Sequence, residues 1–272
     1  MQVALDVARE AAAIVMGVYA RPFDVDFKIG DDPVTRADRE ANAHICERLL
    51  KEFPGVPVVA EESDPATYAG YATADAAWFV DPLDGTREFV AKNGQFAVMI
   101  GLAEQGRATL GVVVAPAWRR ALVGVIGEGA WEVSADGVAT PVHVSSRPSL
   151  AGASVVVSRS RTPDGMAAFL ASIGAAPPVP HGSSGLKGVL VATGAHDVYL
   201  HPGNAGMRWD ACATEGLVRA AGGECTDADG KPFDYRSASL ENSRGMVATN
   251  GRLHAALVEA LRRAVASAAA PG

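Results

Sequence analysis

The chain has 272 residues, 49% of them hydrophobic and 20% charged, a composition typical of an ordinary globular protein that gives no sign of intrinsic disorder. A net charge of −7 leaves no basic surplus to neutralise a phosphate backbone, so we expect no nucleic-acid polymer as a partner. No stretch approaches the ~18 consecutive apolar residues of a transmembrane segment, and Asp6, Arg9 and Glu10 interrupt any signal-peptide core. We therefore expect a cytoplasmic protein, associated with the inner membrane at most peripherally.

The cysteines, Cys46, Cys212 and Cys225, are an odd number and include no C-x-x-C pair. This usage is typical of small buried side chains in a reducing compartment. A disulfide framework is therefore not expected.

The first half of the chain reads as helices around a β-rich block, because helical spacing of apolar residues gives way to alternation and regular turn signals. The expected elements, in order, are a helix at 3–20, a strand at 25–29, a turn at 30–38, a helix to about 53, a strand at 56–60, a polar linker at 63–76, an apolar strand from 78, an antiparallel meander over 96–133 and an edge strand at 138–144.

After Pro148 strands and helices alternate, which is typical of an α/β arrangement. The expected elements are a strand at 153–158, a helix at 163–173, a proline-rich connection at 175–180, a helix to about 193, a strand at 197–200, a helix at 211–221, strands at 224–226 and 245–249, and a helix at 251–266. The change of pattern predicts an N-terminal α+β subdomain (1–148) and a C-terminal α/β subdomain (149–272), with the active site in the cleft between them.

The stretch from Trp78 to Phe89 is the most informative in the chain. Its apolar run reaches Asp81 and Asp84, and Pro82 should end the strand pairing because it fixes φ and lacks an N–H donor. Two carboxylates so close repel each other unless a cation lies between them, and hard oxygen ligands favour Mg²⁺ or Ca²⁺. Gly85 and Thr86 offer backbone N–H groups at a helix start, which suits an anion. A metal site beside an anion site indicates phosphate chemistry. The alternative is that this stretch is only a capped turn with two solvated aspartates.

Other polar residues at element ends gain meaning beside this stretch. Glu61 follows an apolar strand and would complete a carboxylate cluster, although adjacent acids there are often only a solvated loop. Asp38 and Asp210 lie at helix starts, where an acid also has a purely structural role. The run from Gly182 to Gly185, with Lys187 one turn into the following helix, is a possible second anion site or a simple helix cap.

Three motifs together resemble the inositol monophosphatase superfamily of Mg²⁺-dependent, lithium-sensitive phosphatases. They are Glu61-Glu62-Ser63 after a strand, W-x-x-D-P-x-D-G-T from Trp78 to Thr86, and W-D-x-x-x-x-E from Trp209 to Glu215. Their order and spacing agree along nearly the whole chain. The resemblance implies an α/β layered sandwich with the αβαβα architecture of inositol monophosphatases and fructose-1,6-bisphosphatases.

The resemblance also implies two or three bound Mg²⁺ ions. Glu61, Asp81 and the carbonyl of Leu83 would hold the first ion, and Asp81, Asp84 and Asp210 the second. A third, weaker ion would lie near Glu61.

For catalysis the resemblance implicates Asp38, Thr86 and Glu61. Asp38 belongs to a Pro33-Val34-Thr35-x-x-Asp38 motif, and would accept a hydrogen bond from the Thr86 hydroxyl and help to activate water. No covalent phospho-enzyme is expected, because no Cys or His stands in a suitable motif.

Within the superfamily the sequence is most similar to the CysQ-type 3′(2′),5′-bisphosphate nucleotidases, through Asp81–Phe89, Ser158-Arg159-Ser160 and the Gly-Ser-Ser…Lys segment. That branch usually has His directly after Ser-Arg-Ser, where this chain has Arg161. The implied substrate-binding residues are Glu61, Leu83, Asp84, Gly85, Thr86, Ser158, Arg161, Ser183, Lys187 and Asp210.

The implied activity is removal of the 3′-phosphate from adenosine 3′,5′-bisphosphate by a monomer or homodimer. The first alternative is a phosphatase of inositol or of another small sugar or histidinol phosphate. The second is a non-catalytic anion-binding protein, which the complete acid set disfavours.

Overall fold

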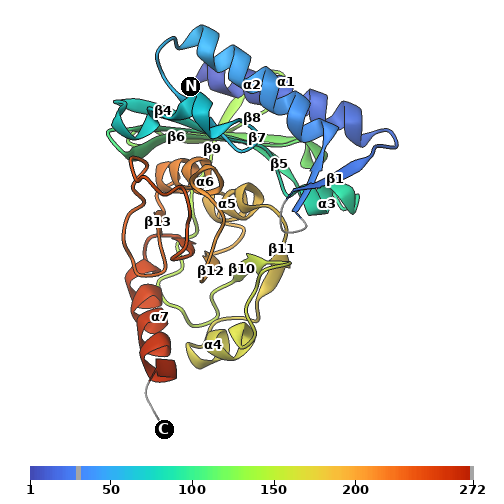
Figure 1. Cartoon of the computed structure of the whole chain (residues 1–272). Coiled ribbons are helices and arrows are strands. Elements are labelled where there is room, and N and C mark those ends of the chain that lie inside the picture. The colour runs from blue at the N-terminus through green and yellow to red at the C-terminus, as the bar shows by residue number, and fades with distance from the viewer. Residues whose placement is uncertain (29–31, 270–272) are drawn as a thin grey trace.

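The computed structural model describes residues 1–28 and 32–269 (Figure 1). The predicted residues Ile29, Gly30 and Asp31 therefore lie outside the described part of the chain. No helix within that part is long and apolar enough to cross a membrane.

Five layers alternate between helices and sheets (Figure 1). Helices α1 (Gln2–Tyr19) and α2 (Arg36–Glu52) cover one face of a seven-stranded sheet, and α5 (Ser184–Ala192) and α6 (Arg208–Ala220) cover the other. A five-stranded sheet lies beyond α5 and α6, and α4 (Met166–Ser172) and α7 (His254–Ala269) cover its far face. This is the α/β layered sandwich that the sequence resemblance implies.

The seven-stranded sheet contains the predicted meander. Its strands follow chain order, β3 pairs with β4 in parallel, and the other neighbours are antiparallel. The strands are β3 (Val58–Ala60), β4 (Ala76–Asp84), β5 (Ala97–Glu104), β6 (Arg107–Ala115), β7 (Arg120–Val125), β8 (Gly129–Val133) and β9 (Ala139–Pro141). The short helix α3 (Thr86–Val90) follows β4 directly.

The five-stranded sheet has the order β11-β10-β12-β14-β13, with β10 parallel to both of its neighbours. Its strands are β10 (Val155–Ser158), β11 (Val179–His181), β12 (Val198–His201), β13 (Glu224–Thr226) and β14 (Met246–Thr249). Because β10 and β11 are parallel, Ser158 at the end of β10 lies beside His181 at the end of β11. The segments that follow the two strands therefore lie together.

Three local predictions are wrong. Residues Asp32–Thr35, predicted as part of a turn, form strand β2, which pairs with β1 (Val25–Lys28). The proline-rich connection contains strand β11, an edge strand in which Pro180 is tolerated. Strand β4 does not end at Pro82 but continues to Asp84, because a register shift between Asp81 and Asp84 accommodates the proline as a bulge does.

A row of glycines lets α6 approach the seven-stranded sheet closely. Gly101, Gly111 and Gly124 are direct neighbours across β5, β6 and β7. A Cβ built on Gly111 would lie 2.1 Å from the carbonyl oxygen of Ala213 in α6. One on Gly216 of α6 would lie 2.6 Å from the backbone nitrogen of Gly111, so the contact is backbone against backbone from both sides. This contact fixes the height of α6, and therefore of the residues at its start, above the sheet.

We predict that Gly111→Ala lowers the free energy of unfolding by about 1–3 kcal/mol, because the added methyl group must push α6 from the sheet. Chemical denaturation measures this loss. Gly17→Ala is the matched control, because Gly17 lies in helix α1 with nothing within 4 Å of an added Cβ. It should be neutral or stabilise by up to ~1 kcal/mol. Equal stability of the Gly111→Ala variant and the wild type would contradict the packing argument.

Candidate active site

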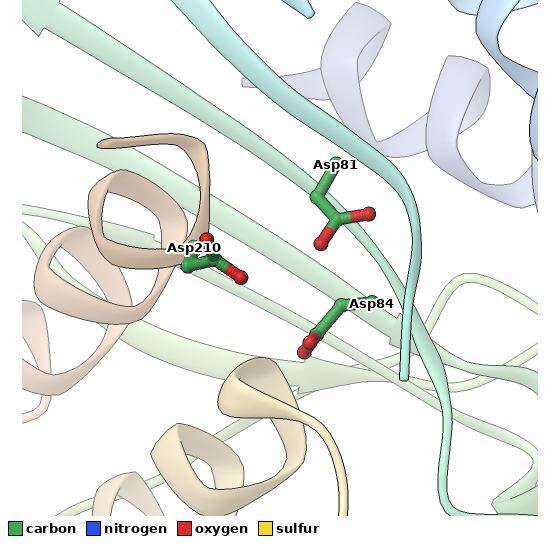
Figure 2. Close-up of side chains that lie close together, drawn as sticks. All are labelled: Asp81, Asp84 and Asp210. Atoms are coloured by element: carbon green, nitrogen blue, oxygen red, sulfur yellow. The ribbon is translucent and has the colours of Figure 1, made fainter. Parts of the chain in front are cut away.

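The end of β4 presents two buried carboxylates. The bulge around Pro82 turns Asp81 and Asp84 towards the same side, and the Leu83 N–H donates to Asp81 Oδ1 at 3.0 Å (Figure 2). Gly85, with φ of +95°, turns the chain from β4 into α3. A Cβ there would also lie 2.8 Å from the carbonyl oxygen of Gln95, so a glycine is required on both grounds.

Asp210 reaches the same place from the first turn of α6 (Figure 2). The helix cap is Met207, not Asp210, and the Met207 N–H donates to Asp210 Oδ2 at 2.6 Å. Glycine is required at 206, with φ of +81°, because a Cβ would lie 2.4 Å from Asp210 Oδ2. The backbone before the helix therefore fits closely around this carboxylate.

Together these residues form a cluster of three carboxylates, Asp81, Asp84 and Asp210, in which one oxygen of each lies within 4.8 Å of the others (Figure 2). Burial raises the pKa of Asp81 well above its usual range, and the charges of Glu61, Asp84 and Asp210 raise it further. Burial, followed by the charges of Asp84 and Glu61, raises the pKa of Asp210 to about 8. Oxygen-only donors held together at such a cost fit a hard divalent cation such as Mg²⁺ or Ca²⁺.

Glu61 lies beside this cluster rather than within it. It follows β3, and its N–H donates to the carbonyl oxygen of Val80 at 3.1 Å, which continues the parallel pairing with β4. Its Oε1 accepts a hydrogen bond from Lys28 at 2.9 Å, and Lys28 also contacts Glu62. Burial raises the pKa of Glu61 to about 7, although Lys28 opposes the change.

Lys28 is a site residue that the sequence pattern does not predict. It lies on β1, about thirty residues from the two glutamates in the sequence, and alternation in that strand gives no sign of the contact. Burial alone would lower its pKa, but Glu61 and Glu62 raise it overall. The ammonium group is therefore charged and partly neutralises the acidic site.

Asp38 and Thr86 are in contact, as the sequence resemblance implies. Thr86 Oγ1 lies 3.0 Å from Asp38 Oδ1 and 3.1 Å from the carbonyl oxygen of Leu83, so its single proton can be donated to either. Asp38 Oδ2 accepts from the backbone N–H and the hydroxyl of Thr35, at 2.7 and 2.6 Å. Burial raises the pKa of Asp38 even though these donors lower it. Asp38 is thus both the first-turn acid of α2 and a partner of the site.

The start of α5 forms the opposite wall. The Ser183 hydroxyl donates to Asp84 Oδ2 at 2.5 Å, and the Gly185 N–H donates to the same oxygen at 2.7 Å. The donors that the sequence suggested as a possible second anion site thus hold the carboxylate of Asp84 in this structure.

Lys187 lies one turn further along α5 and is buried. Its Nζ donates to the carbonyl oxygen of Ser183 at 2.5 Å and lies 4.9 Å above the ring of Tyr199. A contact to the His181 carbonyl at 3.4 Å is longer, so one of the three ammonium protons remains available. Burial lowers its pKa to about 8, whereas Asp84 and Asp210 oppose the change.

One cavity joins these groups. Every predicted metal-binding and substrate-binding residue lines it, whereas Asp38 lies behind Thr86. The predicted members are Glu61, Asp81, Leu83, Asp84, Gly85, Thr86, Ser158, Arg161, Ser183, Lys187 and Asp210. The lining residues that the sequence reasoning missed are Arg87, Glu88, Arg159, Ser160, Gly182, Ser184, Tyr199, His201 and Ala205. Six of these fall inside recognised motifs, which was the available signal: Arg87, Glu88, Arg159, Ser160, Gly182 and Ser184.

The pKa shifts predict how the stability of the metal-free protein changes with pH. Glu61 and Asp210 have pKa values of about 7 and 8 in the folded state, against roughly 4 in an unfolded chain. The folded state then holds protons that the unfolded state has released, so the stability from these groups is lost as the pH rises through 7 and 8.

In EDTA, the melting temperature should therefore fall between pH 6.5 and 8, and saturating Mg²⁺ should reverse the fall. Buried histidines such as His201, with a pKa lowered to about 4, act in the opposite direction below roughly pH 6.5, so lower pH is avoided. Asp210→Asn should flatten the profile. A wild-type melting temperature that is constant over this range, or an equal slope in the variant, would refute the electrostatic argument.

Comparison with known proteins shows which family has this sequence and fold. Residues 1–266 match the model of the inositol monophosphatase family. A 3′(2′),5′-bisphosphate nucleotidase CysQ from Salmonella typhimurium is 39% identical over 231 residues, which cover 84% of this chain and 90% of that protein.

Solved structures of proteins from the same family are also similar to this chain. CysQ from Bacteroides thetaiotaomicron is 29% identical with a TM-score of 0.74, covering 92% of this chain and 96% of the other. Inositol monophosphatase from Anabaena is 27% identical with a TM-score of 0.76, covering 97% and 94%.

Proposed function

Because the chain belongs to the inositol monophosphatase family, we propose that it is a metal-dependent 3′(2′),5′-bisphosphate nucleotidase, which converts adenosine 3′,5′-bisphosphate to AMP and phosphate. The observation that carries the proposal is the buried carboxylate cluster in a cavity that also holds Lys187 and Arg161. The acids suit metal ions at a phosphate to be cleaved, and the cations suit a phosphate that is retained. The similarity to CysQ proteins supports this choice of substrate.

In this proposal the metal ligands are the side chains of Glu61, Asp81, Asp84 and Asp210 and the carbonyl oxygen of Leu83. When bound, two or three Mg²⁺ ions supply positive charge that acidifies water and neutralises the attacking and leaving oxygens. Hydrolysis of a phosphate monoester is otherwise among the slowest reactions known in water.

The protein's own groups position the reactants and move the proton. The Thr86 hydroxyl orients the attacking water, takes up its proton and passes its own proton to Asp38, which lies behind it. Glu61, which lines the cavity, is the alternative acceptor of that proton, and burial raises the pKa of both carboxylates towards the range useful for a base. The N–H groups of Gly85 and Thr86 lie at the turn into α3 and donate to the phosphate oxygens.

The substrate's second phosphate would be held by the cationic wall of the cavity. Lys187 acts there as a point charge with one free proton, and Arg161 as a planar donor. Ser158 and Ser183 line the same cavity and contribute to the substrate-binding surface.

A phosphate-release assay tests the substrate. With Mg²⁺, we predict a kcat/KM for adenosine 3′,5′-bisphosphate at least about tenfold above those for inositol 1-phosphate and histidinol phosphate, because only the first carries a second phosphate for the cationic wall. Lithium should inhibit. Equal or better turnover of inositol phosphate would favour a sugar phosphatase, and no hydrolysis of any of the three would favour a non-catalytic anion-binding protein.

Asp81→Asn should lower kcat by about 10³-fold or more, since it removes a ligand that both proposed ions share. The rise in melting temperature on adding Mg²⁺ should vanish with it, as bound metal stabilises only the folded state. In EDTA the variant should be at least as stable as the wild type, because one member of a repelling cluster is neutral.

Asp24→Asn is the matched control, since Asp24 is exposed and is not among the residues that line the cavity. It should leave both activity and the Mg²⁺-dependent rise in melting temperature unchanged. Wild-type activity of Asp81→Asn would exclude the proposed role of this aspartate.

A further inference from the structure

One wall of the cavity consists of two segments that follow parallel strands. Residues 158–161 begin at the last residue of β10, and residues 182–183 come directly after β11. The Arg159 N–H donates to the carbonyl oxygen of His181 at 3.1 Å, which extends the strand pairing into the wall. The Arg161 N–H donates to Ser158 Oγ at 3.2 Å, so the Ser158–Arg161 segment folds back on itself as a tight turn.

Two residues that lie between β4 and β5 of the seven-stranded sheet, Glu88 and Gln95, contact this wall. Glu88 of α3 forms an ion pair with Arg159, with 3.5 Å between Oε1 and Nε. Gln95 accepts from Arg159 Nη2 at 3.0 Å and from the Gly182 N–H at 2.8 Å, both through its Oε1. We call Glu88, Gln95, Arg159 and Gly182 the cross-layer clamp.

The Glu88 end of the clamp is buried. The Glu88 side chain is only 10% exposed, and a buried carboxylate requires charged or hydrogen-bonding partners, which Arg159 and Asn93 provide. A Cβ on Gly182 would lie 2.4 Å from Glu88 Cγ, so no larger residue fits between the two segments. The planar Arg159 guanidinium reaches Glu88 and Gln95 at once, which a lysine could not do.

Of two arginines that lie two positions apart in the sequence, the clamp binds only one. Arg159 is engaged by the protein, whereas the Arg161 side chain forms no hydrogen bond or ion pair with residues 1–28 or 32–269. Arg161 lines the cavity close enough to Lys187 and His201 to act on both electrostatically. Holding Arg159 therefore fixes the direction in which Arg161 leaves the turn.

We propose that the cross-layer clamp is a specificity device: Glu88 and Gln95 position the Ser158–Arg161 segment so that Arg161 receives the phosphate that is not cleaved. This inference rests on the proposed bisphosphate nucleotidase function. Glu88 and Arg159 are positioning residues, because both are engaged by protein groups and act through Arg161. Their loss should weaken binding of a bisphosphate without affecting the cleavage step.

The test compares adenosine 3′,5′-bisphosphate with adenosine 3′-monophosphate, which offers the same scissile bond without the second phosphate. Glu88→Gln should raise KM for the bisphosphate about tenfold, the equivalent of roughly 1.4 kcal/mol, with kcat within about twofold of wild type. For the monophosphate kcat/KM should stay within about twofold. Arg159→Lys, which keeps the charge but loses the planar fork, should give the same pattern.

Glu132→Gln is the control, since Glu132 forms a hydrogen-bonded ion pair with Arg120, at 2.7 Å, between β7 and β8, and neither residue lines the cavity. It should behave as wild type on both substrates. An equal fall in kcat/KM for both substrates in Glu88→Gln, or no change for either substrate, would overturn the proposal.

Failure of the proposed function is distinguishable from failure of the clamp. If the wild type does not hydrolyse the bisphosphate, the substrate assignment is wrong, and amide hydrogen exchange still tests the positioning role. Faster exchange of residues 158–162 in Glu88→Gln than in Glu132→Gln would support the clamp. Equal exchange in the two variants would overturn it.

Discussion

The structure depends on holding three mutually repelling carboxylates within 4.8 Å of one another in a buried site. Asp81 and Asp84 come from β4, and Asp210 comes from α6, more than a hundred residues later. Backbone-to-backbone contact between α6 and the row at Gly101, Gly111 and Gly124 sets their separation. Packing between α6 and the sheet thus opposes the repulsion within the site.

Hydrogen bonds from the backbone fix the orientations of the carboxylates that this packing brings together. Each carboxylate of the cluster accepts at least one backbone N–H, from Leu83, Gly185 or Met207 respectively, so each has a fixed orientation before any ion binds. The bulge at Pro82 contributes in the same way, since it lets one strand carry two acids towards the same cavity. Preorganisation of this kind favours ions whose ligands must be held in a set geometry.

Most helices and strands and the centre of the site could be predicted because they depend on local signals, whereas the layered fold was implied by the resemblance of three motifs to a known family. Asp81, Asp84, Gly85 and Thr86 fall within nine residues of Trp78, and strand and helix periodicity is clear on either side. Strand β2 was missed because a short segment with Pro33 reads as a turn, and the persistence of β4 past Pro82 depends on a bulge that only its partner strand reveals.

Long-range contacts escaped prediction for a similar reason. Lys28 meets Glu61 across 33 positions and Arg159 meets Gln95 across 64, and neither pair has a spacing rule. The glycine row likewise emerges only when β5, β6 and β7 are placed in register. Such features belong to tertiary structure, where a single sequence carries no direct signal.

The distribution of the carboxylates over β4 and α6 also has a consequence for how the protein folds. The meander from β5 to β8 joins neighbours in the sequence, whereas α6 must return to it from about a hundred residues away, and local contacts generally form faster than distant ones. We therefore expect the cluster to be completed late, when α6 docks. Metal binding would then couple to the last assembly step, so divalent ions should slow unfolding far more than they accelerate folding.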